Sequence, residues 1–232
     1  MNAQPDIPAF LDRRPFVGTF TILSSYKNCP HQMFRRYIVK DQPYIETPEM
    51  KFGNDVHTAF ERRIGSRTPL PDTMRQWECF ATPFDAHIAQ VEQKLGITAE
   101  GRATGFFDNN VWFRGKNDVT LINGTTAYLL DFKTGKSGYE DPFELATNAM
   151  LLHAKKPELT KIVGSYCWLK ENRMGQLYDV SSTLETWNEV CRLMGEILAK
   201  RAQDAAAFEK IKSGLCGWCS VSDCENWFER RK

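Results

Sequence analysis

Three side chains within residues 118–136 have the types and spacing to do chemistry: Asp118, Asp131 and Lys133. Residues 119–122 and 128–132 are β-prone, and the Asn123-Gly124 pair between them predicts a hairpin, because a type I′ turn needs positive φ at both central positions. A two-residue loop places position 118 opposite 129, and a four-residue loop places it opposite 131. Both registers put the three side chains on one face, whereas a three-residue loop would not.

The chemistry that this face predicts is metal-assisted hydrolysis. Cross-strand neighbours lie about 5 to 8 Å apart, a separation at which two carboxylates can share a metal ion. Oxygen ligands with open positions suit Mg²⁺ or Mn²⁺, and such an ion polarises a phosphoryl oxygen while Lys133 steadies the attacking water. The alternative is an exposed Asp/Lys ladder, but the apolar neighbours Leu129, Leu130 and Phe132 argue against a solvated strand.

The elements that must position these residues alternate between helix and strand. We expect helices from Ser24 or Ser25 to Tyr37, after Pro48 to a stop at Gly65, and over residues 74–95, 142–153 and 184–208. Strands are predicted near residues 111–113, in the hairpin, and over 162–169. A hairpin that feeds a helix and a further strand is typical of an α/β domain flanked by helices, and no clean linker interrupts residues 1–232.

Composition sets the frame for function. The chain has 232 residues and a net charge of +1, so a nucleic-acid contact would have to come from local patches. The N-terminal residues carry no basic segment followed by an apolar run, and no stretch is long and apolar enough to span a membrane. Seven cysteines without an export signal indicate a reducing compartment. We therefore expect a cytoplasmic protein, or one of the host cytoplasm if it is viral.

The C-terminal residues hold a second chemical pattern. Cys216, Cys219 and Cys224 have the spacing C-x₂-C-x₄-C, and Cys29 before Pro30 is the best candidate for a fourth ligand. Four cysteines can bind Zn²⁺ or an iron–sulfur cluster, and spacing alone does not choose between them. The alternative is a set of buried free thiols, but these cysteines lie among Gly, Ser and Asp with few apolar neighbours.

These motifs together resemble the PD-(D/E)XK nuclease superfamily, in its RecB-like branch with the CRISPR-associated type of iron–sulfur exonuclease and its viral relatives. Residues 24–30 with Phe34 are similar to the family's first helix and its N-terminal cluster cysteine. The other matches are the G-x-x-x-H motif at Gly53 and His57, the G-x-x-D motif at Gly115 and Asp118, the D-[FY]-K-T-G motif at residues 131–135, and the C-terminal cysteine triplet.

The resemblance implies a restriction-endonuclease-like core, in which helices flank a mixed central sheet, with a helical N-terminal part and a C-terminal cysteine cluster. It implies that His57, Asp118 and Asp131 bind Mg²⁺ or Mn²⁺, that Lys133 and Glu144 join them in catalysis, and that a 4Fe-4S cluster, or alternatively Zn²⁺, is structural. The implied activity is that of a DNA exonuclease on single strands or duplex ends, in recombination, replication or repair, with proteins of recombination or replication as possible partners. The alternative is a non-catalytic DNA- or partner-binding module that keeps this fold.

Two positions depart from the family pattern. Where the family often has Gln and, four residues later, Tyr, this chain has Glu144 and Asn148. Glu144 can contact a metal-bound water or the DNA backbone, or it can be a charge favoured at a helix N-terminus. The last cysteine spacing is one residue shorter than usual. Glu100 is a weaker acidic candidate, and Leu130 stands where a phosphate-binding loop would need glycine, so no nucleotide cofactor is expected.

Overall fold

The structure is a computed structural model that describes residues 15–42, 46–138 and 140–229. Within it the chain divides into two compact units, one formed by Met1–Ile45 with Glu189–Lys232 and the other by Glu46–Asn188. The prediction of one domain over residues 1–232 stays a prediction. No helix of the described residues is both long enough and apolar enough to cross a membrane.

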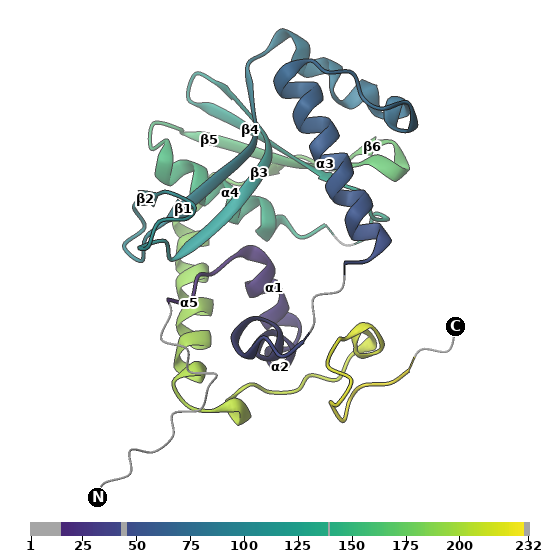
Figure 1. The fold of residues 1–232 in the computed structure, drawn as a ribbon. Helices are drawn as coiled ribbons and strands as arrows, with labels where there is room; N and C mark the ends of the chain where they lie inside the picture. Colours follow the sequence, from purple (N-terminus) through teal and green to yellow (C-terminus); the bar gives the residue numbers. More distant parts are fainter. Residues whose placement is uncertain (1–14, 43–45, 139, 230–232) are drawn as a thin grey trace, which may run out of the picture. The chain divides into compact units, whose positions relative to one another are not determined.

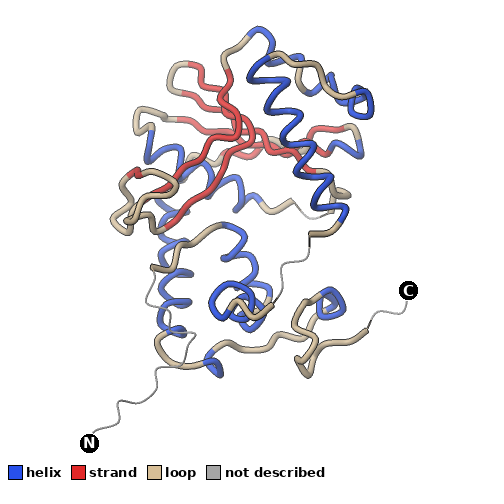
Figure 2. The backbone as a smooth tube through the Cα atoms, viewed as in Figure 1, coloured by secondary structure: helices blue, strands red, loops and turns tan. Residues whose placement is uncertain are grey.

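The unit Glu46–Asn188 is built on a mixed sheet of seven strands, drawn in red in Figure 2. Its strands are β1 (Ala89–Ile97), β2 (Ala103–Thr104), β3 (Phe113–Asn123), β4 (Thr126–Lys133), β5 (Lys161–Trp168), β6 (Arg173–Met174) and β7 (Tyr178–Asp179). They lie in the order β2-β1-β3-β4-β5-β6, and β7 pairs with β5. Only β4 and β5 pair in parallel among these ladders, which requires a crossover connection. Helix α4 (Pro142–Lys155) provides it.

The predicted hairpin is confirmed, and its register is the one that pairs position 118 with 131. The ladder of β3 and β4 runs from Asn123 and Thr126 to Val119 and Leu130, so one further step brings Asp118 opposite Asp131. The turn residues are therefore Gly124 and Thr125, one position later than the strongest turn signal, with Gly124 at φ 58°. Because the shift keeps the parity of the strands, it leaves both aspartates on one face.

Helix α3 (Pro48–Ser66) covers one face of this sheet (Figure 1). Thr47 caps its N-terminus by accepting a hydrogen bond from the Met50 amide, and Arg67 ends it in the left-handed conformation, two residues after the predicted stop at Gly65. An apolar stripe of α3 packs into one buried cluster with side chains from three strands. The members from these elements are Val56, Phe60, Ile64, Val119, Phe132 and Cys167.

Helix α4 lies on the opposite face. Its Leu145 packs on Gly164 of β5, where an added Cβ would meet Leu145 at 3.1 Å. Gly164 and Cys167 are three positions apart on β5, so they face opposite sides of the sheet, and Cys167 belongs to the cluster under α3. Asp141 caps α4 by accepting from the Phe143 amide. The predicted α/β architecture, with a mixed central sheet flanked by helices, is confirmed.

The predicted helix over residues 74–95 is wrong. The chain there forms two 3₁₀ segments, η2 (Asp72–Phe80) and η3 (Thr82–Ala86), and then strand β1. Pro83 removes a backbone donor and disfavours helical backbone at the residue before it, which breaks a continuous α-helix. Buried Met74 and Trp77 are three residues apart, a spacing that 3₁₀ and α-helical segments share. Of the strand predicted near residues 111–113, only Phe113 lies in a strand, as the first residue of β3.

The second unit is mainly helical. It contains α1 (Phe20–Asn28), α2 (Pro30–Met33), the π-helix η1 (Phe34–Val39), most of α5 (Thr183–Arg201), and the 3₁₀ segments η5 (Ala205–Ala207) and η6 (Gly214–Trp218). The first helix starts earlier than predicted, because Thr19 rather than Ser24 or Ser25 accepts the capping hydrogen bond. It is also interrupted at Cys29, whose φ of −161° is extended. The last long helix ends at Arg201, not at residue 208. A further 3₁₀ segment, η4 (Leu169–Glu171), follows β5 in the sheet unit.

Candidate metal centre

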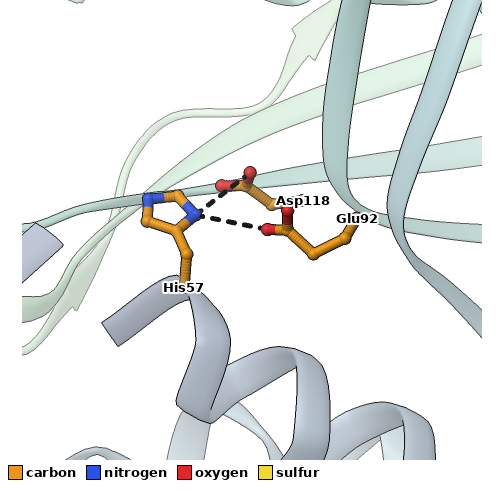
Figure 3. Close-up of side chains that lie close together, drawn as sticks. All are labelled: His57, Glu92 and Asp118. Atoms are coloured by element: carbon orange, nitrogen blue, oxygen red, sulfur yellow. Dashed lines mark ion pairs between the residues drawn. The ribbon is translucent and has the colours of Figure 1, made fainter. Parts of the chain in front are cut away.

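The candidate metal centre is a group of three ligand-type side chains from α3, β1 and β3. Nδ1 of His57 lies 3.2 Å from Oδ1 of Asp118 and 3.6 Å from Oε1 of Glu92, and Figure 3 shows the imidazole aimed at both carboxylates. One ligand atom of each residue lies within 4.8 Å of the others. His57 and Asp118 are residues that the sequence indicates, and the structure brings them together.

Glu92 is the member that sequence reasoning missed. Its neighbours pair Val91 with Val119 and Gln93 with Asn117, so Glu92 stands opposite Asp118. A strand assignment for β1 would have placed it there, but residues 74–95 were expected to be helical. The alternation of Ala89 and Val91 with polar residues is the signal that favours a strand. Glu100, the acidic residue considered instead, accepts a hydrogen bond from the Thr98 hydroxyl in its own turn and is not in the three-residue group.

The backbone of Glu92 explains how its carboxylate reaches the centre. Its φ of 49° is left-handed, which is strained for a non-glycine residue. Val91, before it, packs against the cluster under α3. Leu95, after it, pairs with Gly115, whose Cα faces α4. In a regular strand positions 91 and 95 would share a face, so the strand reverses its faces at Glu92.

Asp131, Lys133 and Glu144 form a second group beside the first. The Lys133 ammonium lies 2.8 Å from Oδ2 of Asp131 and 2.8 Å from Oε2 of Glu144. Asp118 contacts the same strand, because its Oδ2 accepts a hydrogen bond from the Phe132 amide at 2.9 Å. The sequence-predicted residues therefore converge, but Asp131 lies with Lys133 and Glu144 and outside the group of His57.

The charges of the two groups follow from burial and pairing. Burial lowers the pKa of His57, but the close approach of the Asp118 and Glu92 carboxylates outweighs this effect and raises that pKa to about 10. Burial and the neighbouring Asp118 raise the pKa of Asp131, against the opposing effect of Lys133. Burial disfavours the ammonium of Lys133, yet Asp131 and Glu144 raise its pKa above the usual range. Lys133 is therefore a fixed cation and not a proton acceptor.

A divalent cation fits the donor set of this centre. Nδ1 of His57 and Oδ2 of Asp131 are buried and make no well-directed hydrogen bond within the described chain, although both approach charged groups. Buried polar atoms without partners are rare in folded proteins. An imidazole nitrogen with carboxylate oxygens from Glu92 and Asp118 suits a first-row divalent ion or Mg²⁺. A bound cation would take the place of the proton on His57.

Glu144 and Asn148 of α4 occupy defined places. Glu144 anchors Lys133 and lies 3.4 Å from the hydroxyl of Tyr166, which donates to the Asp141 carbonyl at 2.6 Å. Asn148 packs over Gly115, where an added Cβ would lie 2.8 Å from its Oδ1. The glycine of the G-x-x-D motif is thus needed for close packing between β3 and α4.

The four predicted cluster cysteines line one pocket in the other unit, together with His31, Lys210 and Trp227. Burial raises the pKa of Cys219, and the other three cysteines add to that rise. Cys216 accepts a hydrogen bond from the Ser213 amide, and Cys219 accepts one from the Val221 amide. Among the described residues only the group of His57 has three ligand atoms within 4.8 Å of one another, so no three of these sulfurs are that close.

Comparison with known proteins finds solved structures with a similar fold but no matching protein family. No protein-family profile matches the sequence, and no curated protein matches it. The structure resembles that of SSO0001, with a TM-score of 0.51 and 14% identity over 93% of this chain and 89% of the other. It also resembles a protein from Eubacterium rectale named "Putative exonuclease", with a TM-score of 0.54 and 11% identity over 100% of this chain and 96% of the other. At such identities the likeness is one of fold.

Proposed function

We propose that this protein is a divalent-metal-dependent nuclease that hydrolyses phosphodiester bonds of DNA. We further propose that it is an exonuclease on single strands or duplex ends, serving recombination, replication or repair. The observation that carries the proposal is the placement of His57, Glu92 and Asp118 beside the half-buried ammonium of Lys133. The name of the Eubacterium rectale protein is consistent with this chemistry.

The residues of the centre have distinct roles in this proposal. His57, Glu92 and Asp118 would hold Mg²⁺ or Mn²⁺, and Asp131 would add a ligand through its Oδ2. The ion supplies charge stabilisation and an activated water. The Lys133 ammonium orients that water and stabilises the negative charge that develops on the phosphoryl oxygens. Glu144 keeps Lys133 in place when Asp131 turns to the ion, which makes it a positioning residue.

We also propose that Cys29, Cys216, Cys219 and Cys224 hold a structural 4Fe-4S cluster. A single zinc ion with bonds of about 2.3 Å would hold its four sulfurs roughly 3.8 Å from one another, whereas no three of these sulfurs lie within 4.8 Å of one another. Amide donors to Cys216 and Cys219 suit sulfur ligands that carry negative charge. Zn²⁺ is the alternative occupant.

Iron and zinc analysis of protein purified without oxygen separates these occupants. We expect about four irons per chain with visible absorbance, a loss of both in Cys219→Ser, and no loss in the control Cys191→Ser, which changes a cysteine outside the pocket. One zinc per chain without iron would show that Zn²⁺, and not a 4Fe-4S cluster, occupies the pocket. If metal-free wild-type protein has the same melting temperature as a reconstituted sample, the cluster has no structural role.

The nuclease proposal is tested by digestion of DNA labelled at the 5′ or 3′ end, as single strands and as duplexes, with Mg²⁺ or Mn²⁺. We expect hydrolysis from an end that stops when the ion is chelated. Asp118→Asn should lower the rate at least a hundredfold, because it removes a charged ligand from the centre. The matched control is Asp72→Asn, which changes an exposed carboxylate that is not part of the metal centre. Equal rates in both variants would exclude the assignment of this centre.

The alternative function is a non-catalytic module that binds DNA or a protein partner with this fold. It is favoured by Glu144 and Asn148, which replace the family's Gln and Tyr. Binding of DNA by the wild-type protein without hydrolysis under any of the metal conditions would establish this alternative.

A further inference from the structure

A cationic face continues from the metal centre along β1 and β3. Lys94 pairs with Lys116, and Gly96 pairs with Arg114. Residues directly opposite in an antiparallel ladder share a face, as do residues two apart on one strand. Lys94, Lys116 and Arg114 therefore lie on the same side of the sheet. Two like charges directly opposite each other are destabilising, and of these two lysines Glu92 pairs only with Lys116, which points to an anionic ligand for Lys94.

Two aromatic rings border these cations. Phe106 and Phe107 meet edge to face, with centroids 4.9 Å apart, and Phe107 is 74% exposed. The Arg114 guanidinium lies 4.6 Å from the Phe106 centroid, and the Lys94 ammonium lies 5.4 Å from that of Phe107. We call Lys94, Phe106, Phe107, Arg114 and Lys116 the Lys94 face. Such an exposed ring among cations matches the stacking platforms that bind unpaired bases.

Most of the positive charge on this face is not neutralised by the protein. Among the described residues, neither Lys94 nor Arg114 forms an ion pair with a carboxylate. Asp108 in the adjoining loop is an exposed carboxylate, and it accepts hydrogen bonds within that loop from the Thr104 hydroxyl at 2.8 Å and from the Gly105 amide at 2.7 Å. A groove beside β1 is lined by Lys94 together with Lys155, Gly96 and Gly105, which adds a further ammonium to the same area.

The face connects directly to the metal centre. Lys116 forms an ion pair with Glu92, which in turn contacts His57. Arg114 lies four positions before Asp118 on β3, which is roughly 13 Å at the usual rise per residue. The face therefore begins at the centre and extends away from it along β3.

We propose that the Lys94 face binds the single-stranded DNA that adjoins the phosphate in the metal centre. Lys94, Arg114 and Lys155 contact successive phosphates, and Phe107 stacks on a base. A duplex does not present base faces along its length, so the exposed ring selects an unpaired strand. This inference rests on the proposed nuclease function and names its substrate class.

Binding without chemistry tests the face directly. The probes are a labelled single strand and a blunt duplex of the same sequence, measured by fluorescence anisotropy in the presence of a chelator that prevents hydrolysis. Phe107→Ala should weaken single-strand binding at least fivefold, the lower end of the loss of one base–aromatic stack. Lys94→Gln should lower the slope of log K against log salt by about 0.7, the value for one phosphate of a single strand.

The controls are Tyr128→Ala, which removes an aromatic ring that is 46% exposed on β4, and Lys161→Gln, which removes an exposed lysine of β5. Neither should change single-strand binding by more than twofold. Because Phe107 and Lys94 are exposed, their variants should melt as the wild type does, and the duplex should respond less than the single strand.

The results separate this inference from the nuclease proposal. Unchanged single-strand affinity in Phe107→Ala and Lys94→Gln would refute the proposal that the Lys94 face binds single-stranded DNA, even if the wild type digests DNA. An equal loss of duplex and single-strand binding would overturn the preference for unpaired strands. If the wild type binds single strands through the Lys94 face but never hydrolyses DNA, the proposed binding role of the face stands and the proposed nuclease function is excluded.

Discussion

Replacement of Lys133 by Met tests whether its ammonium holds the two carboxylate groups together. The ammonium lies 2.8 Å from both Asp131 and Glu144, and methionine keeps the approximate length of the side chain without its charge. Removing one partner of a buried ion pair costs about 3 to 5 kcal/mol. Because the side chains of Lys133 and Glu144 are 29% and 25% exposed, we expect the lower end, about 3 kcal/mol. At 2 to 4 °C per kcal/mol, the melting temperature should fall by about 6 to 12 °C.

The same change should affect catalysis separately from binding. An ammonium that stabilises charge in the transition state contributes about a hundredfold to a thousandfold to kcat. We therefore expect Lys133→Met to lose hydrolysis by that factor while its affinity for single-stranded DNA stays within about threefold of the wild type. The control is Lys170→Met, which changes an exposed lysine of η4.

A double variant decides whether the electrostatic reasoning is correct. Glu144→Gln alone should cost about 1 kcal/mol, because it weakens one charged hydrogen bond. In the Lys133→Met background, the same change removes a carboxylate that has lost its cation, so stability should rise by at least about 1 kcal/mol. Hydrolysis should not return. If Lys133→Met melts as the wild type does, or if the double variant is less stable than Lys133→Met alone, the described pairing is refuted.

Three further predictions concern neighbouring features. Glu92→Gln should weaken Mn²⁺ binding at least tenfold in calorimetric titration, because it removes a charged ligand, while Glu100→Gln should bind as the wild type does; equal affinities would exclude Glu92 from the centre. Arg63 holds Asp85 with two hydrogen bonds and lowers the pKa of that carboxyl, so its stabilising effect is present above about pH 4 and is lost as pH falls through the lowered pKa. In urea unfolding, the free energy of unfolding of Arg63→Gln should be well below that of the wild type at pH 7, and the difference should be smaller at pH 3. A difference that does not change with pH would contradict the pairing of Arg63 with Asp85. Gly115→Ala should destabilise by about 1 to 3 kcal/mol, because its Cβ would lie 2.8 Å from α4 side chains, whereas Gly135→Ala, with open space around it, should not, and similar melting of both would refute the close packing.

The hairpin and the placement of its polar side chains were predictable because they depend on neighbours in the sequence. Turn residues near Gly124 bring β3 and β4 together, and the period of two in a strand places Asp118, Asp131 and Lys133 without help from the rest of the chain. The shift of the turn by one residue did not matter, because it preserved parity. The same local reasoning placed α3 and α4, whose caps and apolar spacing are readable from the sequence.

The partition of the site was decided by tertiary structure. Glu92 joins His57 only because β1 pairs with β3 and reverses its faces at a left-handed residue; the alternation around Val91 indicates a strand but not this reversal. Glu144 anchors Lys133 because the crossover between β4 and β5 returns α4 to that end of the sheet. The residue types and the hairpin register were thus set by local sequence, whereas the choice of which carboxylate meets the imidazole and which meets the ammonium depended on contacts between segments distant in the chain. Those contacts form only when packing buries the segments together, and local propensity carries little information about them.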